Sequence, residues 1–416
     1  MQPELSARCC IAGGGPAGMM LGYLLARAGI DVVVLEKHDD FLRDFRGDTI
    51  HPSTLEVMDK LGLYDRLLQR PHQRTPTASA RFGTLSAVVA DFRHLPVRGK
   101  FIAMMPQWDF LDFIATEAKR YPSFRLMMRT EVTDLIKEND RIVGVIAQTP
   151  DGETQIRSDV VVGCDGRTST VRALAGLQVI PIGAPMDVIW FRMSRASGDP
   201  TESMGSFGRG AILVMINRGE YWQCGYVIAK GSVEQARTRG IEAFHQEIVK
   251  IAPFMTDRIE KITDFDDLRL LTVNVDRLKR WHRPGLLCIG DAAHAMSPIG
   301  GVGINLAIQD AVATANLLAV PLRRNHVTDN DLHHVQRRRQ SPTRKTQTMQ
   351  VFFQKNVITP VLGSLEEFKP PLPVRLIARW PWLARFPARI AGIGFRPEYP
   401  DLAVVDCTEP SERDTR

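Results

Sequence analysis

The sequence predicts an α/β protein with a Rossmann-type domain, an interleaved mixed or antiparallel-sheet domain, and a helical C-terminal segment. Three observations carry this prediction: a glycine-rich strand–loop–helix near the N-terminus, a second such junction far along the chain, and alternating apolar strands between them. The 416 residues suffice for two or three domains. A hydrophobic fraction of 44% and a charged fraction of 24% are typical of a soluble globular protein.

The first junction is a complete βαβ pattern. The strand RCCIA leads into GGGPAG, which is followed by the helix MMLGYLLARAG and the strand DVVVLE. Gly13 permits the tight turn, Gly15 lets the backbone approach a pyrophosphate, and Gly18 lets the helix pack close to the strand. The helix N-terminus offers its N–H groups to the phosphates. Glu36 ends the second strand and can bind a ribose diol, which disfavours NADP but leaves NAD and FAD open.

The second junction favours FAD. The strand RPGLLCIGD ends in Asp291 at the carboxyl edge of a sheet, where ligands of open α/β sheets bind. That carboxylate suits a ribityl chain. The segment PIGGVGINLAIQDA then predicts a loop and a new helix beginning near Gly303 or Ile304, whose N–H groups can face the pyrimidine end of a flavin. FAD is long enough to need both junctions.

A third motif lies between the junctions. Two alternating strands joined by PDGE predict a hairpin, and the second strand runs into Asp165 and Gly166. Ser169 and Arg172 open a short helix after them.

These motifs resemble those of the class A flavoprotein aromatic hydroxylases, the group built like para-hydroxybenzoate hydroxylase. GGGPAG with Glu36, CDGRTSTVR and GDAAHAMSPIGGVGINLAIQDA occur in the family's order. The resemblance implies that Pro298 lies beside the reactive edge of the flavin, as a catalytic as well as a binding position. The residues that it assigns to cofactor binding are Gly13, Gly15, Pro16, Ala17, Gly18, Glu36, Lys37, Arg46, Gln107, Val132, Asp165, Gly166, Asp291, Pro298, Gly301, Gly303, Ile304 and Asn305.

The implied reaction is hydroxylation. NADH or NADPH reduces FAD, reduced FAD captures O2 as a flavin hydroperoxide, and an OH group passes to an electron-rich ring. The sequence has no second GxGxxG βαβ unit of the kind found in two-nucleotide reductases. Alternatives are a flavin-dependent reductase or dehydrogenase without oxygen insertion, and a non-catalytic flavin-binding protein. The WxWxIP motif of flavin halogenases is absent.

Asp48 and His51 precede the predicted helix STLEVMDKLG, and both are candidates for a base that deprotonates a phenolic substrate. Turn formation after Gly47 and helix capping are the alternative roles. We expect His294 to be structural.

The substrate region is expected in residues 181–270, where MDVIWFRMS, AILVMINRG and YWQCGYVIAKG predict antiparallel strands. Residues 81–92 are expected to add strands to this sheet. Arg192, Trp222 and Tyr226 are the candidate substrate contacts, although the aromatic side chains fit a sheet packing on its own core equally well. The apolar strands favour a neutral aromatic or polycyclic substrate.

The sequence predicts two domains, each built from separate segments of the chain, and a C-terminal segment. They are 1–75, 107–180 and 271–350 for the FAD-binding domain, 76–106 and 181–270 for the substrate domain, and 351–416 for the C-terminal helical segment and tail.

The remaining features mainly exclude classes of function. Six cysteines without a CxxC pair predict a reduced, cytoplasmic protein without a metal site. No signal peptide and no uncharged apolar run of spanning length are evident. The basic run 321–345 lacks interleaved aromatics, which disfavours nucleic acid. The basic amphipathic segment RLIARWPWLARFPARIAGIGF is expected to pack on its own domain, with contact to a membrane surface as the alternative. We expect a monomer or homodimer.

Overall fold

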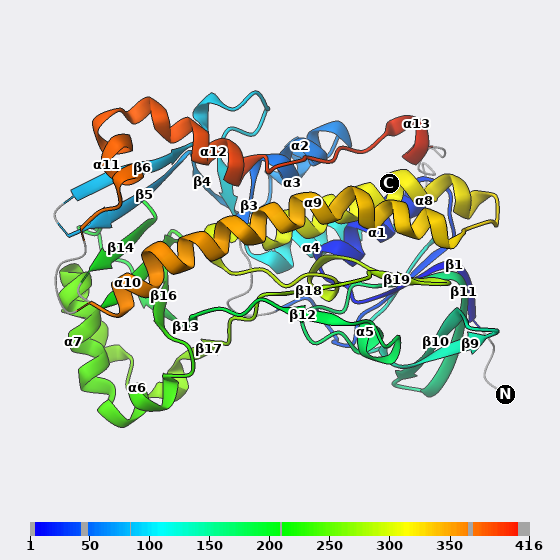
Figure 1. Ribbon diagram of the computed structural model, residues 1–416, viewed down its shortest axis with the longest axis horizontal. Helices are drawn as coiled ribbons and strands as arrows, with labels where there is room; N and C mark the ends of the chain where they lie inside the picture. Colours follow the sequence, from blue (N-terminus) through cyan, green and yellow to red (C-terminus); the bar gives the residue numbers. More distant parts are fainter. Residues whose placement is uncertain (1–4, 43–48, 84, 209, 365–368, 407–416) are drawn as a thin grey trace, which may run out of the picture.

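The computed structural model describes residues 5–42, 49–83, 85–208, 210–364 and 369–406. Two sheets lie at opposite ends of the molecule, and two long helices run lengthwise between them (Figure 1). These helices are α8 (Gly303–Arg323) and α9 (Asp329–Phe353).

The first sheet is mixed, with a parallel centre. Strands β1, β2, β8, β11 and β20 pair in parallel, whereas β9, β10 and β19 pair antiparallel at its margins. A parallel centre buried on both faces explains the continuous apolar runs of these strands. In spatial order the strands are β19 (His282–Arg283), β20 (Leu286–Cys288), β11 (Gly152–Gly163), β1 (Leu5–Ala12), β2 (Val32–Leu35) and β8 (Phe124–Met127), with β10 (Arg141–Thr149) beside β11 and β9 (Glu131–Glu138) beside β10.

Three helices build the main hydrophobic core together with this sheet. α1 (Pro16–Arg27) packs against both α4 (Gln107–Ala118) and α8. The segment Ile299–Arg323 is long and apolar enough to cross a membrane, but 78% of its apolar window is buried inside the protein. It is therefore the core helix of this domain.

The second sheet is largely antiparallel. Its strands in spatial order are β17 (Arg269–Leu271), β13 (Met186–Ser194), β16 (Tyr221–Ala229), β15 (Ala211–Asn217), β14 (Met204–Gly208), β5 (Thr77–Phe82) and β6 (Leu85–Asp91). The strands within residues 77–91 thus join strands from beyond residue 185, and β14 pairs in parallel with β5. The exact boundaries of the predicted domain segments stay predictions.

Alternate residues of the second sheet enter two different cores. One face packs against α7 (Ile241–Ile251). The other packs against residues of α9, η7 (Gln354–Ile358) and α10 (Thr359–Leu362), and against Ile299 of the second junction. This second face is therefore the one directed toward the first sheet.

Shorter elements connect the two sheets. Two small sheets are β3 (Thr49–Ile50), β7 (Ile102–Met104) and β4 (Gln73–Thr75), and β12 (Val179–Pro181) with β18 (Asp276–Leu278). The remaining elements are α2 (Pro52–Lys60), α3 (Tyr64–Leu67), α5 (Thr170–Leu174), α6 (Val233–Arg239), η1 (Phe92–His94), η2 (Pro253–Met255), η3 (Ile259–Lys261), η4 (Phe265–Asp267), η5 (Gly290–Ala292) and η6 (Ile299–Gly301).

The C-terminal segment forms short helices, as its prolines predict. They are α11 (Leu372–Arg379), η8 (Pro381–Ala384), α12 (Arg385–Gly392) and α13 (Leu402–Val405). α11, η8 and α12 all contact β6, and the chain then crosses the molecule to α13, which packs on α8 (Figure 1).

Candidate active site

The glycine loop of the first junction is sterically closed on one side and open on the other. Gly13 has φ +106°, and a Cβ there would lie 2.5 Å from the carbonyl oxygen of Cys164. A Cβ on Gly18 would lie 1.9 Å from the carbonyl oxygen of Gly13, whereas a Cβ on Gly15 would meet no atom within 4 Å. The loop thus packs tightly on the sheet while Gly15 faces open space, which is where a phosphate can approach the backbone.

The N-terminus of α1 is available to an anion. Gly15 is its N-cap and Pro16 opens the helix, so within the described residues no side chain caps the first turn. Its N–H groups and the positive end of the helix dipole are what a pyrophosphate requires. Ala17 and Gly18 are buried in this turn.

Glu36 lies against this loop, just after β2. Its carboxylate accepts hydrogen bonds from the backbone N–H of Gly14 (2.9 Å) and of His38 (3.1 Å). Lys37 is exposed and pairs with Glu131 at 3.7 Å, and the neighbouring Val132 is buried in β9. The structure therefore brings Glu36, Lys37 and Val132 to the same edge as the glycine loop.

The second junction lies at the carboxyl end of β20. Asp291 falls within η5 and is about one third exposed, with its carboxylate 3.0 Å from Nε of Arg167. Arg167 belongs to the middle motif, so the ion pair joins two of the three sequence motifs. The carboxylate keeps an exposed surface for a second partner, such as a polyol hydroxyl.

The loop after Asp291 is shaped by positive φ angles. Pro298 precedes η6, and Gly300 and Gly301 have φ of +78° and +63°. A Cβ on Gly301 would lie 2.5 Å from Oγ1 of Thr49, whereas a Cβ on Gly303 would meet nothing within 4 Å. Gly303 and Ile304 begin α8, as predicted, and within the described residues this helix also has no side-chain cap.

Asn305 ties the second junction to the segment before α2. Its Oδ1 accepts hydrogen bonds from His51 N and from Thr54 Oγ1, both at 2.8 Å. Its Nδ2 donates to the carbonyl oxygens of Thr49 (3.1 Å) and Gly301 (3.3 Å). All four positions of the amide are used, so Asn305 holds the loop that begins α8 against the loop that begins α2.

In the middle motif, Asp165 stabilises the start of α5 and Gly166 borders open space. The Asp165 carboxylate accepts hydrogen bonds from Ser169 Oγ (2.5 Å) and Val171 N (2.9 Å), so it helps to cap α5. Burial raises the pKa of Asp165, and the hydrogen bond from Ser169 opposes this shift. Gly166 has φ +85° and would carry a Cβ into open space.

Gln107 is the first residue of α4, as predicted from the sequence.

The comparisons with known proteins agree with this arrangement. A family model described as "FAD binding domain" matches residues 6–348. 6-Methylpretetramide 4-monooxygenase of Streptomyces rimosus is 31% identical over 385 residues, which are 92% of this chain and 91% of that protein. The chain belongs to the class A FAD-dependent monooxygenases.

One further relative matches in sequence, and one solved structure matches in fold. Rifampicin monooxygenase of Rhodococcus hoagii is 28% identical over 325 residues, 72% of this chain but 61% of that protein. The crystal structure of p-nitrophenol 4-monooxygenase PnpA from Pseudomonas putida DLL-E4 superposes with a TM-score of 0.72 at 20% identity, covering 97% of this chain and 96% of that one. At that identity the superposition shows the fold alone.

The geometry of this monooxygenase fits FAD. Two helix N-termini are open, at Gly15 and Gly303, and a carboxylate accompanies each junction, Glu36 at the first and Asp291 at the second. Amide hydrogens suit the pyrophosphate and the pyrimidine oxygens, and carboxylates suit the ribose and ribityl hydroxyls. Arg46, expected near the cofactor, lies outside the described residues.

The structure buries His51, one of the two candidate bases. This residue is the N-cap of α2, its side chain is fully buried, and Nδ1 lies 2.8 Å from the carbonyl oxygen of Ala391 in α12. Burial lowers the pKa of His51 to about 4, although the hydrogen bond to Ala391 opposes this shift. With Nδ1 facing this carbonyl, Nε2 is the nitrogen left to accept a proton, and it is buried without a hydrogen-bond partner in the described part of the chain. A role for His51 as base therefore stays a prediction, which requires the substrate to reach this buried atom. Asp48, the other candidate base, lies outside the described residues.

Trp222 and Tyr226 pack in the core of their own sheet, which is the alternative that the sequence left open. Both belong to the core on the α7 side of the second sheet. Trp222 Nε1 donates to Asp199 (2.8 Å), and Tyr226 Oη donates to Glu247 of α7 (2.6 Å). Because successive side chains of a strand point to opposite faces, the residues next to these two face the first sheet instead.

The face toward the first sheet is predominantly apolar. Trp190 lies opposite Gly225 in the pairing of β13 with β16, and a Cβ on that glycine would meet the indole ring at 3.1 Å. The indole therefore covers the glycine. Arg192 shares this face near its exposed end, with its guanidinium 5.2 Å from the Tyr221 ring centroid. The residues sharing this face of the three central strands include Val188, Trp190, Ile212, Val214, Gly225 and Val227.

Sequence reasoning missed a buried ionic cluster beneath the second junction. Asp310 of α8 accepts hydrogen bonds from Arg339 Nε (2.8 Å) and Gly290 N (3.1 Å), and its carboxylate is 2.6 Å from His294 Nε2. Arg339 of α9 also lies 3.5 Å from Glu398. Burial alone would raise the pKa of Asp310, but His294 and Arg339 hold it below its ordinary value. The signal available in the sequence was that Asp310 is the single carboxylate of the predominantly apolar segment that forms α8.

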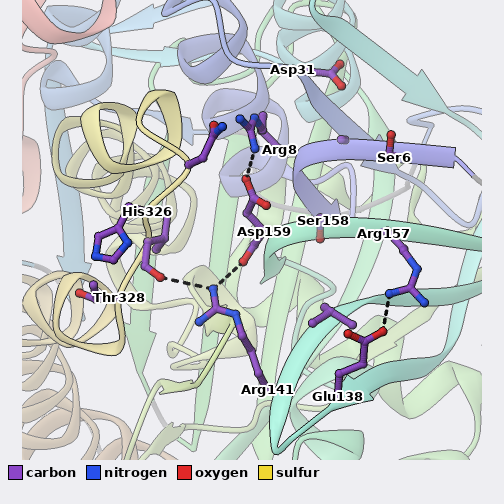
Figure 2. A pocket seen from close by; sticks show the side chains of 14 residues that line it. Ser6, Arg8, Asp31, Glu138, Arg141, Arg157, Ser158, Asp159, His326 and Thr328 are labelled. Carbon is purple, nitrogen blue, oxygen red and sulfur yellow. Dashed lines mark hydrogen bonds and ion pairs between the residues drawn. The ribbon is translucent and has the colours of Figure 1, made fainter.

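A different cleft lies at the opposite edge of the first sheet. It has a volume of about 890 Å³ and is lined by the start of β1, the middle of β11, the β9–β10 hairpin and the α8–α9 connection (Figure 2). Its arginines are engaged: Arg8 pairs with Asp159, Arg157 with Glu138, and Arg141 donates to two backbone carbonyls. Because cofactors of such sheets bind at the carboxyl ends of the strands, this cleft is separate from the FAD site.

Proposed function

We propose that this FAD-dependent monooxygenase uses NADH or NADPH and O2 to hydroxylate a neutral, hydrophobic aromatic or polycyclic small molecule. The observation that carries the choice of substrate class is the apolar face of the second sheet, which meets Ile299 of the second junction in one hydrophobic cluster. The names of the relatives support it, because one acts on 6-methylpretetramide and another on rifampicin.

The two junctions would share the binding of the cofactor. The first turn of α1 binds the pyrophosphate through its N–H groups, and Glu36 accepts hydrogen bonds from the ribose. Asp291 accepts hydrogen bonds from the ribityl chain while Arg167 fixes the orientation of its carboxylate. The first turn of α8 stabilises negative charge at the pyrimidine end. Bound FAD supplies the electron transfer and the activation of oxygen.

The remaining residues position the substrate and exclude water. The loop from Pro298 to Gly301 lies between the start of α8 and the apolar sheet face, so a ring bound on that face would lie beside it. Apolar walls strengthen the electrostatic interactions inside the site and protect it from bulk water. We propose Asp48, the other candidate, as the base for a phenolic hydroxyl, since the His51 imidazole is fully buried and its lowered pKa makes it a weak proton acceptor.

A product assay tests the proposal. Purified holoenzyme is mixed with NADH or NADPH and a panel of polycyclic phenols, and NAD(P)H oxidation is followed together with product mass. We expect substrate-dependent oxidation and a product heavier by one oxygen atom. Oxidation that yields only hydrogen peroxide with every substrate would favour a reductase. A bound flavin that neither nicotinamide reduces would favour a non-catalytic flavoprotein.

A further inference from the structure

The C-terminal helices carry an exposed surface that the FAD site does not explain. α11, η8 and α12 all pack on β6, with Val374, Ala384 and Ala388 turned inward. Their outward side chains are large and apolar: Leu372 is 63% exposed, Trp382 56% and Phe386 60%. Such side chains usually pack into a core, and three adjacent short elements exposing them form an unusual patch.

The exposed side chains form rows with helical spacing. Residues four apart lie on the same side of an α-helix, as Leu372 and Leu376 do in α11 and Phe386 and Ile390 do in α12. Trp380 follows α11, and Trp382 lies in η8 with its ring centroid 6.1 Å from that of Phe386. Beside each row lies a pair of exposed arginines, also four residues apart. The first row is Leu372, Leu376 and Trp380 with Arg375 and Arg379, and the second is Trp382, Phe386 and Ile390 with Arg385 and Arg389. We call this set of ten side chains the outer patch.

The charge of the outer patch is of one sign. Residues 369–396 contain one lysine, five arginines and no aspartate or glutamate. None of the four patch arginines forms an ion pair with a carboxylate in the described part of the chain, and Arg385 reaches only His94 Nε2, at 3.4 Å. A binding partner for the outer patch must therefore carry negative charge and also provide an apolar environment for the exposed side chains.

We propose that the outer patch docks the enzyme on the surface of an anionic lipid bilayer. The apolar rows would enter the boundary between headgroups and acyl chains, and the arginines would contact the lipid phosphates. Tryptophan and arginine beside aliphatic side chains are suited to that boundary, because each has an apolar body and a polar tip. A second copy of this chain is disfavoured, since a two-fold interface would place the same positive charges against each other.

Co-sedimentation of the holoenzyme with vesicles tests this inference. One set contains phosphatidylcholine alone and the other adds one quarter phosphatidylglycerol, each at about 0.1 M and about 0.5 M salt. We expect binding to the anionic vesicles at the lower salt and a loss of about tenfold or more at the higher salt. Absence of binding to anionic vesicles overturns the proposal.

Matched variants locate the binding surface. Trp382→Ser/Phe386→Ser and Arg385→Gln/Arg389→Gln should each weaken vesicle binding by about tenfold or more. The control Arg237→Gln/Arg269→Gln removes the same charge from exposed positions outside the patch and should bind like the parent. Flavin content and NAD(P)H oxidation without vesicles should be unchanged in all three, which shows that they fold.

Two results would contradict the proposal even if vesicles are bound. Equal binding by the patch variants and the control would place the lipid contact elsewhere. A parent dimer in light scattering that the Trp382→Ser/Phe386→Ser variant dissociates would identify the patch as an interface between copies.

Discussion

Replacement of Asn305 by alanine should loosen the cofactor cradle more than its size suggests. The change removes four hydrogen bonds that join the start of α8 to Thr49, His51, Thr54 and Gly301. The side chain is 3% exposed, so water does not readily replace these bonds. At about 1 kcal/mol for each buried bond, the free energy of unfolding should fall by about 4 kcal/mol.

Asn316→Ala is a matched control on the same helix. The Asn316 side chain is partly exposed and makes two hydrogen bonds, to Tyr399 O (2.8 Å) and from Asp401 N (2.9 Å). Its loss should cost about 1 kcal/mol, because water can satisfy the groups left behind. The two variants should therefore differ by about 3 kcal/mol in urea denaturation.

FAD affinity gives an independent measurement of the same reasoning. Asn305→Ala should weaken FAD binding by about tenfold or more, whereas Asn316→Ala should leave it unchanged, because Asn305, unlike Asn316, contacts the loop between Pro298 and Gly303. Equal losses of stability in the two variants, or unchanged FAD affinity in Asn305→Ala, would refute the assignment of Asn305 as the link between the loops.

Three further predictions concern the loop, the ionic cluster and pH. Gly15→Ala should leave the thermal stability of the apoprotein unchanged but abolish FAD binding, because its Cβ would meet no protein atom. Gly18→Ala should destabilise the apoprotein, because its Cβ would collide with the Gly13 carbonyl, so equal melting temperatures of the two apoproteins would contradict this reasoning. Asp310→Asn should lower the free energy of unfolding by about 3 kcal/mol in urea by leaving Arg339 unbalanced, and a neutral effect would contradict the cluster's role. The native pKa of His51, about 4, lies below its unfolded value of about 6.5. Its contribution of about 3 kcal/mol to the free energy of unfolding is therefore present above pH about 6.5 and lost as the pH falls toward about 4. In His51→Asn this loss at low pH should be smaller in denaturation curves, and an unchanged pH dependence would contradict the prediction.

The parts of the fold that sequence reasoning predicted are those with local physical signals. Gly13 and Gly18 mark a loop in which a Cβ would collide with backbone atoms, and α8 begins at Gly303, the last glycine of PIGGVG. The two-residue period of β16 predicted a strand. Period alone does not say which face meets the cofactor domain, so it leaves Trp222 open between a substrate contact and the sheet's own core, where the structure places it.

Long-range partners had no comparable signal. Arg339 lies in a run of arginines, and only folding shows that it is fully buried against Asp310 while its neighbour Arg338 pairs with Glu398 from the surface. In the same way, nothing around His51 indicates that its partner is the carbonyl of Ala391, 340 residues later. The identity of a buried side chain's partner is a property of topology and not of local pattern.

The contact between Ala391 and His51 also has a consequence for the order in which the molecule is assembled. The chain emerges from the ribosome with the glycine loop first, and the α2 loop and the start of α8 precede the segment that closes over them. Glu398 reaches the buried Arg339 at a similarly late stage. Because domains generally fold from the N-terminus during synthesis, a nascent chain has every nucleotide-binding motif before the carbonyl and carboxylate that complete their support. Full rigidity of the flavin cradle is thus postponed until Ala391 and Glu398 have been translated.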